Sequence, residues 1–144
     1  MSDDDPPCSC VIDTGGLHDI ASATGNLKTV ALNQLKNGGI AVPSWAWQEL
    51  KEAYPAEADE LLPYVTKRVI MKQSVSVGAA RIAEKLNSGF STGPYDNHTS
   101  LFTAAVATNN GYRVITAEFD LSAYEDMGCD ACDLETWVTE LGEE

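Results

Sequence analysis

Short, nearly uncharged apolar runs alternate along this chain with longer segments in which apolar residues recur every three or four positions. A strand buried in a parallel sheet has a continuous apolar run, whereas a helix that lies on a sheet has one apolar face. The runs therefore predict strands, at residues 8–14, 40–42, 68–72, 112–116 and 129–132.

The segments between these runs have the patterns of helices. The clearest is at 75–86, where Val75, Ala79, Ile82 and Leu86 fall on one face. The other helices are expected at 17–23, at 27–36 after Gly25, from Pro43 to 52 or 54, at 56–62, at 96–109, at 119–127, and around Trp137 with Asp133 as the N-cap.

Strands that alternate with helices predict an α/β fold. We expect a three-layer α/β/α sandwich with a central, mostly parallel sheet of four to five strands. Neither an internal repeat nor a linker divides the chain, so residues 1–144 form a single expected domain. Its ends, at about 1–7 and 140–144, are short acidic tails that we expect to fray.

The composition limits the function. The chain has 144 residues with 44% hydrophobic content, enough for one core without disulfides. Lys and Arg number 9 against 22 Asp and Glu, a net charge of −13, which argues against a broad electrostatic footprint for a polyanion. The excess of acid is also compatible with an adaptation for solubility or salt.

The chain contains no apolar run of membrane-spanning length and starts with acidic residues, so we expect a cytoplasmic protein without a membrane partner. Its four cysteines are Cys8, Cys10, Cys129 and Cys132. Their spacing is compatible with zinc or redox sites, but both pairs fall in predicted strands, which favours small, buried, reduced residues.

Four acidic residues stand where a parallel fold brings strand ends together. Asp13 closes one apolar run and Glu118 follows another, Asp96 opens a helix, and Glu49 lies at the edge of the apolar face of its helix. Ligands of such sheets bind beyond the carboxyl ends of the strands. Clustered oxygen ligands suit Mg²⁺ or Mn²⁺ and phosphate chemistry.

Taken singly, most of these acids have simpler explanations. Asp96 is a natural N-cap, Glu49 a solvated helix charge, and Glu118 and Asp120 first-turn acids that complement a helix dipole. Asp13 is harder to explain in this way, because an unpaired carboxylate at the end of an apolar strand is costly. Converging carboxylates repel one another, and a divalent ion removes that repulsion.

Three blocks of sequence resemble the acidic blocks of the PIN-domain nucleases, a family that includes the toxin ribonucleases of toxin–antitoxin pairs. The blocks are CVIDTGGLHDI, IAVPSWAWQELKEA and YDNHTSLFTAAVATNNGYRVITAEFDL, within a match over about residues 10–137. The resemblance implies a parallel sheet between helices and Mg²⁺ or Mn²⁺ held by acids of these blocks.

Residue by residue, the resemblance assigns the metal and catalytic site to Asp13, Glu49, Asp96 and an acid after Thr116. The family pattern there is Thr, any residue, Asp. This chain has Thr116, Ala117 and Glu118, with Asp120 two positions on, so Glu118 and Asp120 remain alternatives. Thr14 and Thr116 resemble hydroxyl residues that support the pocket in the family.

The resemblance thus implies a Mg²⁺- or Mn²⁺-dependent endoribonuclease, the toxin of a toxin–antitoxin pair, that leaves a 5′ phosphate and a 3′ hydroxyl. The expected partners are an RNA substrate, an antitoxin protein and a second copy in a homodimer. One alternative is a catalytically weak PIN-like RNA-binding or regulatory module, which suits the charge of −13 and the Glu at 118. A phosphatase with a covalent aspartate is disfavoured, because Gly15 stands where its second Asp belongs.

Other polar and aromatic residues have mainly structural interpretations. His18 and His98 are each close in sequence to a predicted ligand, but local hydrogen bonding is the simpler role. Trp45 and Trp47 flank an apolar helix face, which favours core packing over the stacking of bases.

Overall fold

A computed structural model describes residues 10–87, 98–118 and 121–140 and contains a five-stranded parallel sheet. Its strands follow the order β3-β2-β1-β4-β5. They are β1 (Cys10–Ile12), β2 (Ile40–Pro43), β3 (Arg68–Val69), β4 (Arg113–Ile115) and β5 (Ala131–Cys132). The predicted α/β sandwich is confirmed, and its sheet is parallel throughout the described residues.

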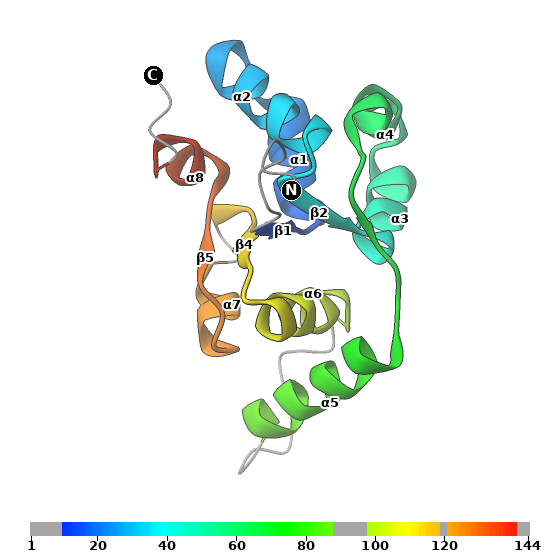
Figure 1. The fold of residues 1–144 in the computed structure, drawn as a ribbon, viewed down its shortest axis with the longest axis vertical. Helices are drawn as coiled ribbons and strands as arrows, with labels where there is room; N and C mark the ends of the chain where they lie inside the picture. The colour runs from blue at the N-terminus through cyan, green and yellow to red at the C-terminus, as the bar shows by residue number, and fades with distance from the viewer. Residues whose placement is uncertain (1–9, 88–97, 119–120, 141–144) are drawn as a thin grey trace, which may run out of the picture.

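Helices cover both faces of this sheet. In Figure 1, α1 to α4 and α8 lie on one side, and α5, α6 and α7 lie on the other. The helices are α1 (Thr14–Ser22), α2 (Gly25–Lys36), α3 (Ser44–Ala53), α4 (Pro55–Leu61), α5 (Gln73–Asn87), α6 (His98–Asn110), α7 (Leu121–Asp126) and α8 (Leu134–Glu140), with a 3₁₀ turn η1 (Leu62–Tyr64) after α4.

Two apolar cores result, one on each face. Successive residues of a strand point to opposite faces, so Cys10 and Ile12 pack beneath α1 to α4 and α8, whereas Val11 packs against α5 to α7. All three are at most 1% exposed, which explains why β1 has no polar position. The acid that follows such a strand lies at the rim of a dry core.

The element boundaries differ from the predictions in several places. Among the described residues, the strand predicted at 8–14 is only Cys10–Ile12, and the helix predicted at 17–23 already begins at Thr14. Gly25 begins α2 with a φ of 63° instead of separating two helices, a conformation that glycine adopts without strain. The strand predicted at 68–72 is only Arg68–Val69, since Ile70, Met71 and Lys72 are exposed. The part of the chain that the structure describes contains no helix long and apolar enough to cross a membrane.

The strand order positions the ends of β1 and β4. From β1 the chain proceeds through β2 to β3 on one side, and β4 and β5 lie on the other side. The order reverses between β1 and β4, and crevices at such reversals are the usual ligand sites of parallel sheets. Asp13 follows β1 and Thr116 follows β4, so both residues are at this reversal.

Candidate functional site

Asp13 accepts one hydrogen bond from its own helix and two from distant parts of the chain. As the N-cap of α1, its Oδ1 accepts the N–H of Gly16 at 2.9 Å. Its Oδ2 accepts the hydroxyls of Thr116 at 2.7 Å and Tyr124 at 2.8 Å. Thr116 and Tyr124 are 0% and 1% exposed, so these donors are fixed by the core. The carboxylate is therefore oriented at the strand-order reversal before any ligand arrives.

Two glycines allow β4 to approach Asp13 so closely. A Cβ on Gly16 would stand 2.5 Å from the carbonyl oxygen of Ile115, and one on Gly15 would stand 3.1 Å from the Cβ of Ala117. The N–H of Asp13 also donates to the Ile115 carbonyl at 3.3 Å. Any side chain at Gly16 would push α1 away from β4 and separate Asp13 from Thr116.

Glu49 of α3 is joined to the residue that follows Asp13. The hydroxyl of Thr14 donates to Glu49 Oε1 at 2.6 Å and lies 3.3 Å from the carbonyl oxygen of Ala46. Glu49 is half-buried, as its position at the edge of the apolar face of α3 predicted. Thr14 thus brings the second candidate carboxylate to the start of α1, beside the first.

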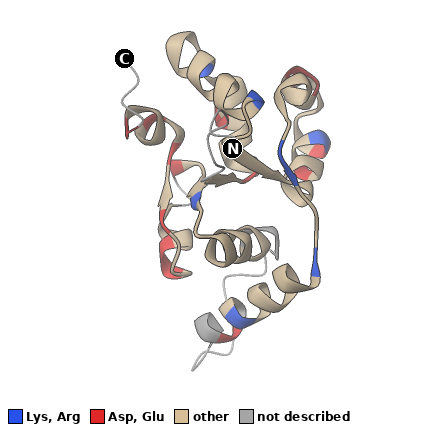
Figure 2. Cartoon of the chain, in the orientation of Figure 1, with Lys and Arg blue, Asp and Glu red and all other residues tan. Residues whose placement is uncertain are grey.

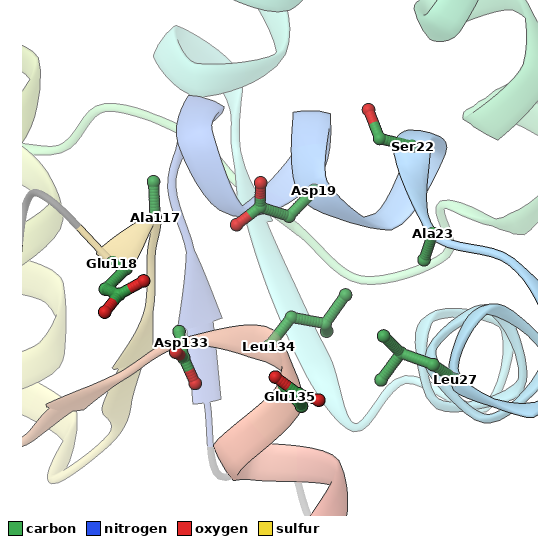
Figure 3. A pocket seen from close by; sticks show the side chains of 9 residues that line it. All are labelled: Asp19, Ser22, Ala23, Leu27, Ala117, Glu118, Asp133, Leu134 and Glu135. Atoms are coloured by element: carbon green, nitrogen blue, oxygen red, sulfur yellow. The ribbon is translucent and has the colours of Figure 1, made fainter.

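Glu118 belongs to a neighbouring pocket. It is exposed and lines a cavity of about 350 Å³ with Asp19, Asp133 and Glu135. Figure 3 shows the carboxylates of Asp19, Glu118 and Asp133 around one space, from α1, from the segment after β4 and from the start of α8. Ala23, Leu27 and Leu134 form the apolar side of this cavity. Asp133 also caps α8 as predicted, through a bond from the N–H of Thr136.

Burial raises the pKa of Asp19 above its ordinary value of 3.8, because a charged carboxylate loses hydration there. The nearby His18 lowers the pKa of Asp19, and the negative charge of Asp133 raises it further. Asp19 and its role in this pocket were not predicted. It lies on a short helix whose neighbours from α8 are distant in sequence, so no local pattern marks it.

The structure thus brings Asp13 and Glu49 together through Thr14, and it places Glu118 in the adjoining pocket. Asp96 and Asp120 lie outside the described residues. Within residues 10–87, 98–118 and 121–140, no group of three or more His, Cys, Asp or Glu is arranged to hold a metal ion. The oxygen donors of Asp13 and Glu49 are nevertheless of the kind that Mg²⁺ and Mn²⁺ prefer.

Tyr124 is the main contributor that the sequence did not indicate. It was expected only as part of a short helix, and it extends from α7 to the Asp13 carboxylate. A buried tyrosine needs a partner for its hydroxyl, which is the one signal that could have drawn attention to it. The hydroxyls of Thr14 and Thr116 bond the site acids, as the family resemblance implied.

The other candidates have structural roles. His18 bonds Glu57 at 2.7 Å through Nδ1 and stacks on Tyr54, while the side chain of His98 lies outside the description. Trp45 donates to the Thr103 hydroxyl at 3.0 Å, and Trp47 is 8% exposed, so both pack in the core as predicted.

The described cysteines are free thiols in or near strands. Cys10 and Cys132 are buried in β1 and β5, which β4 separates. Burial raises the pKa of Cys132 to about 11, although Arg113 opposes this, and burial likewise raises the pKa of Cys129. Protonated, buried thiols agree with the interpretation of these residues as strand packing.

Comparison with known proteins supports the fold. No family model and no curated protein matches the sequence. Among solved structures, the chain is similar to one in DNA-bound VapBC from Salmonella typhimurium, with a TM-score of 0.67, 16% identity, and coverage of 89% of this chain and 99% of that chain. A chain of VapBC-1 from nontypeable Haemophilus influenzae gives a TM-score of 0.61 and 14% identity, over 88% and 98% of the two chains.

A PilT N-terminus domain protein from the archaeon Sulfolobus solfataricus P2 is also similar, with a TM-score of 0.57, 10% identity and coverage of 94% of both chains. Identities this low show a shared fold. The chain therefore has the α/β/α fold of these proteins, a PIN-like fold, as its acidic blocks indicated.

Proposed function

We propose that this protein is a Mg²⁺- or Mn²⁺-dependent endoribonuclease. The observation that carries the proposal is the placement of Asp13 at the strand-order reversal. There two buried hydroxyls, of Thr116 and Tyr124, hold one of its oxygens. A carboxylate that served only as a helix cap would not need two further donors from β4 and α7.

In this proposal Asp13 and Glu49 hold the metal ion together with Asp96 and with either Glu118 or Asp120. A bound divalent ion lowers the pKa of a water molecule and neutralises charge on the phosphate. Thr116, Tyr124 and the Gly16 N–H fix the direction of the Asp13 carboxylate, and Thr14 does the same for Glu49. These residues act on the ligands rather than on the RNA.

The first prediction is that Asp13→Asn and Glu49→Gln each lower RNA cleavage in Mn²⁺ by at least about a hundredfold, because each removes a charge from the ion's ligands. The measurement is the single-turnover rate on a labelled RNA. Glu52→Gln is the matched control on the same helix, since Glu52 is exposed and bonds only Gln48 among the described residues. Equal losses in Glu49→Gln and Glu52→Gln would contradict the proposed site.

The position of Glu118 favours one alternative function. Glu118 lines the pocket of Asp19 and Asp133. If it does not bind the ion held by Asp13, the metal site is incomplete, and the protein would bind RNA but cleave it weakly. Wild-type protein that binds RNA but does not cleave it in Mn²⁺ would support this regulatory module. Cleavage that depends on Asp13 would exclude it.

We further propose that the chain is the toxin of a toxin–antitoxin pair and acts as a homodimer. The likeness to chains of VapBC structures from two bacteria supports an assembly with a partner protein. A carboxylate pocket of this kind is blocked well by an arginine of the partner, whose two N–H groups match a carboxylate.

A further inference from the structure

The charge of this chain is distributed very unevenly. Residues 61–83 contain four Lys or Arg and no Asp or Glu, whereas residues 118–144 contain ten Asp or Glu and no Lys or Arg. The first stretch includes β3 at one edge of the sheet, and the second includes β5 at the opposite edge. Figure 2 shows this polarity, with blue along the segment that joins α4 to α5 and red along α7, β5 and α8. The net charge of −13 therefore conceals a basic edge.

The basic edge is hollowed on both faces of the sheet. On one face, Lys51 and Arg68 line a cavity of about 500 Å³ with Trp47, Gln48 and one acid, Asp59. On the other, Lys72 and Arg81 line a cavity of about 400 Å³ with Asn109 and Asn110, and no acid of the described chain lines it. Each cavity thus has two cations, next to β3.

The cations of this edge have no acidic partners in the described part of the chain. The ion pairs in that part involve His18, Lys28 and Arg113, but none involves the edge residues. The edge cations are all exposed; they are Lys51, Lys67, Arg68, Lys72 and Arg81. Arg68 lies over the Trp47 ring at 5.8 Å, which fixes its guanidinium at the cavity wall. An unpaired, exposed row of cations is suited to an extended anion.

Apolar side chains are exposed between these cations. Ile70 is 62% exposed, Met71 40% and Val77 41%, although the cores elsewhere bury such residues well. A small anion such as phosphate would need only the cations of this edge for binding. Unstacked bases of a single strand would cover this apolar surface, which distinguishes a nucleic acid from a small anion.

The basic edge ends on the same side of the sheet as the candidate site. All five strands are parallel, so the carboxyl end of β3 lies at the same rim of the sheet as Asp13. β3 is two strands from β1, a separation of about 10 Å. A strand of RNA held at Val69 to Lys72 would therefore lie next to the candidate site.

We propose that the β3 edge, defined by Lys51, Lys67, Arg68, Lys72 and Arg81, binds single-stranded RNA and guides it to Asp13. The proposal rests on the proposed ribonuclease function, since it names the path of that substrate. The acidic β5 edge would repel the phosphates of the RNA, which favours a path along the β3 side.

The second prediction tests this path without cleavage. Binding of a labelled single-stranded RNA of mixed sequence is measured by fluorescence anisotropy in EDTA. Lys72→Gln should weaken binding about eightfold at about 50 mM salt, the factor that corresponds to one lost phosphate contact in a single strand, and should reduce the salt slope by about 0.7. Lys67→Gln with Lys72→Gln should double the loss of slope. Lys36→Gln, an exposed lysine at the end of α2, is the matched control.

Equal affinities for the Lys72→Gln and Lys36→Gln variants would overturn the proposal. The proposal would also be overturned if sedimentation showed that the Lys72→Gln variant loses a dimer that the wild type forms, while its affinity for RNA is unchanged. The edge would then be a contact between two copies of the chain. Wild-type protein that binds RNA through this edge in EDTA and fails to cleave it in Mn²⁺ would uphold the path and reject the nuclease. The two proposals therefore fail separately.

Discussion

Asp19 shows how a single carboxyl group can weaken the fold that contains it. Its pKa is raised by burial and by Asp133, so the folded chain binds a proton at Asp19 more readily than the unfolded chain does. The stability associated with Asp19 is therefore greatest in acid. This contribution to the free energy of unfolding falls as the pH rises from 3.8 to the pKa of Asp19 in the folded state. Above that pH the destabilisation by Asp19 is constant.

The third prediction is that Asp19→Asn raises Tm by a few degrees at neutral pH, because the amide removes the buried charge and its repulsion with Asp133. The gain should shrink as the pH falls toward 3.8 and should vanish below it, where Asp19 is protonated in both states. Thermal unfolding across this pH range measures it. Asp59→Asn, on the exposed side of α4, removes the same charge and should show no such dependence.

Site residues differ in how far the sequence predicts them. Asp13 was predictable because an acid at the end of an apolar strand is conspicuous, and the half-burial of Glu49 followed from the helical period of α3. Tyr124 was not, since a short helix gives no direction for an aromatic side chain until α7 packs on the sheet. The metal-binding and catalytic roles of Asp13, Glu49, Asp96, Glu118 and Asp120 all stay predictions.

At the scale of elements, the β1–α1 turn determines how closely β4 can lie to Asp13. Gly16 is buried within the first turn of α1, and its Cα faces the Ile115 carbonyl. In an ordinary helix, alanine in place of glycine stabilises the fold by about 0.5–1 kcal/mol. At Gly16 the clash with the backbone of β4 makes the same substitution destabilising.

The fourth prediction is that Gly16→Ala destabilises the protein by about 1–3 kcal/mol, the usual cost of overpacking, and lowers RNA cleavage by displacing Asp13 from Thr116. Urea unfolding measures the first effect and single-turnover cleavage the second. Ser22→Ala, exposed in the last turn of the same helix, should change neither. A stabilised Gly16→Ala variant would show that α1 and β4 are not in close contact.

Strand and helix order was predictable because each strand is buried on both faces and so appears as an apolar run. Boundaries were less predictable where tertiary contacts decide them. The run at 68–72 has strand-forming residues, yet β3 pairs with β2 over only Arg68 and Val69. After Val69 the described chain pairs with no strand, and the apolar residues Ile70 and Met71 are exposed.

At the scale of the whole molecule, the acidic excess leaves one edge of the sheet basic and the other acidic. Composition alone argued against a polyanionic ligand, because a net charge averages over surfaces that face opposite ways. Only the strand order, which places β3 and β5 at opposite edges, separates the two. The acidic edge would attract a basic partner protein, as the proposed antitoxin requires.

The fifth prediction concerns that partner. Wild-type protein expressed in a bacterium without its genomic neighbour should slow growth, and Asp13→Asn should not, because the metal site is lost. Co-expression of the neighbouring gene should restore growth by occupying the site. Glu52→Gln, which leaves the site intact, should slow growth as the wild type does. Harmless wild-type protein would reject the toxin role.

The bonds to Asp13 also set the order in which activity can appear. Asp13 is made before its hydroxyl partners, which lie 103 and 111 residues later in the chain. We expect these contacts to form late in folding, because the chain loses the entropy of closing a long loop before the contacts stabilise it. A ribosome-bound chain that has not yet released Tyr124 holds Asp13 without its donors. The proposed nuclease would therefore stay inactive beside the messenger and ribosomal RNA that surround it during its own translation.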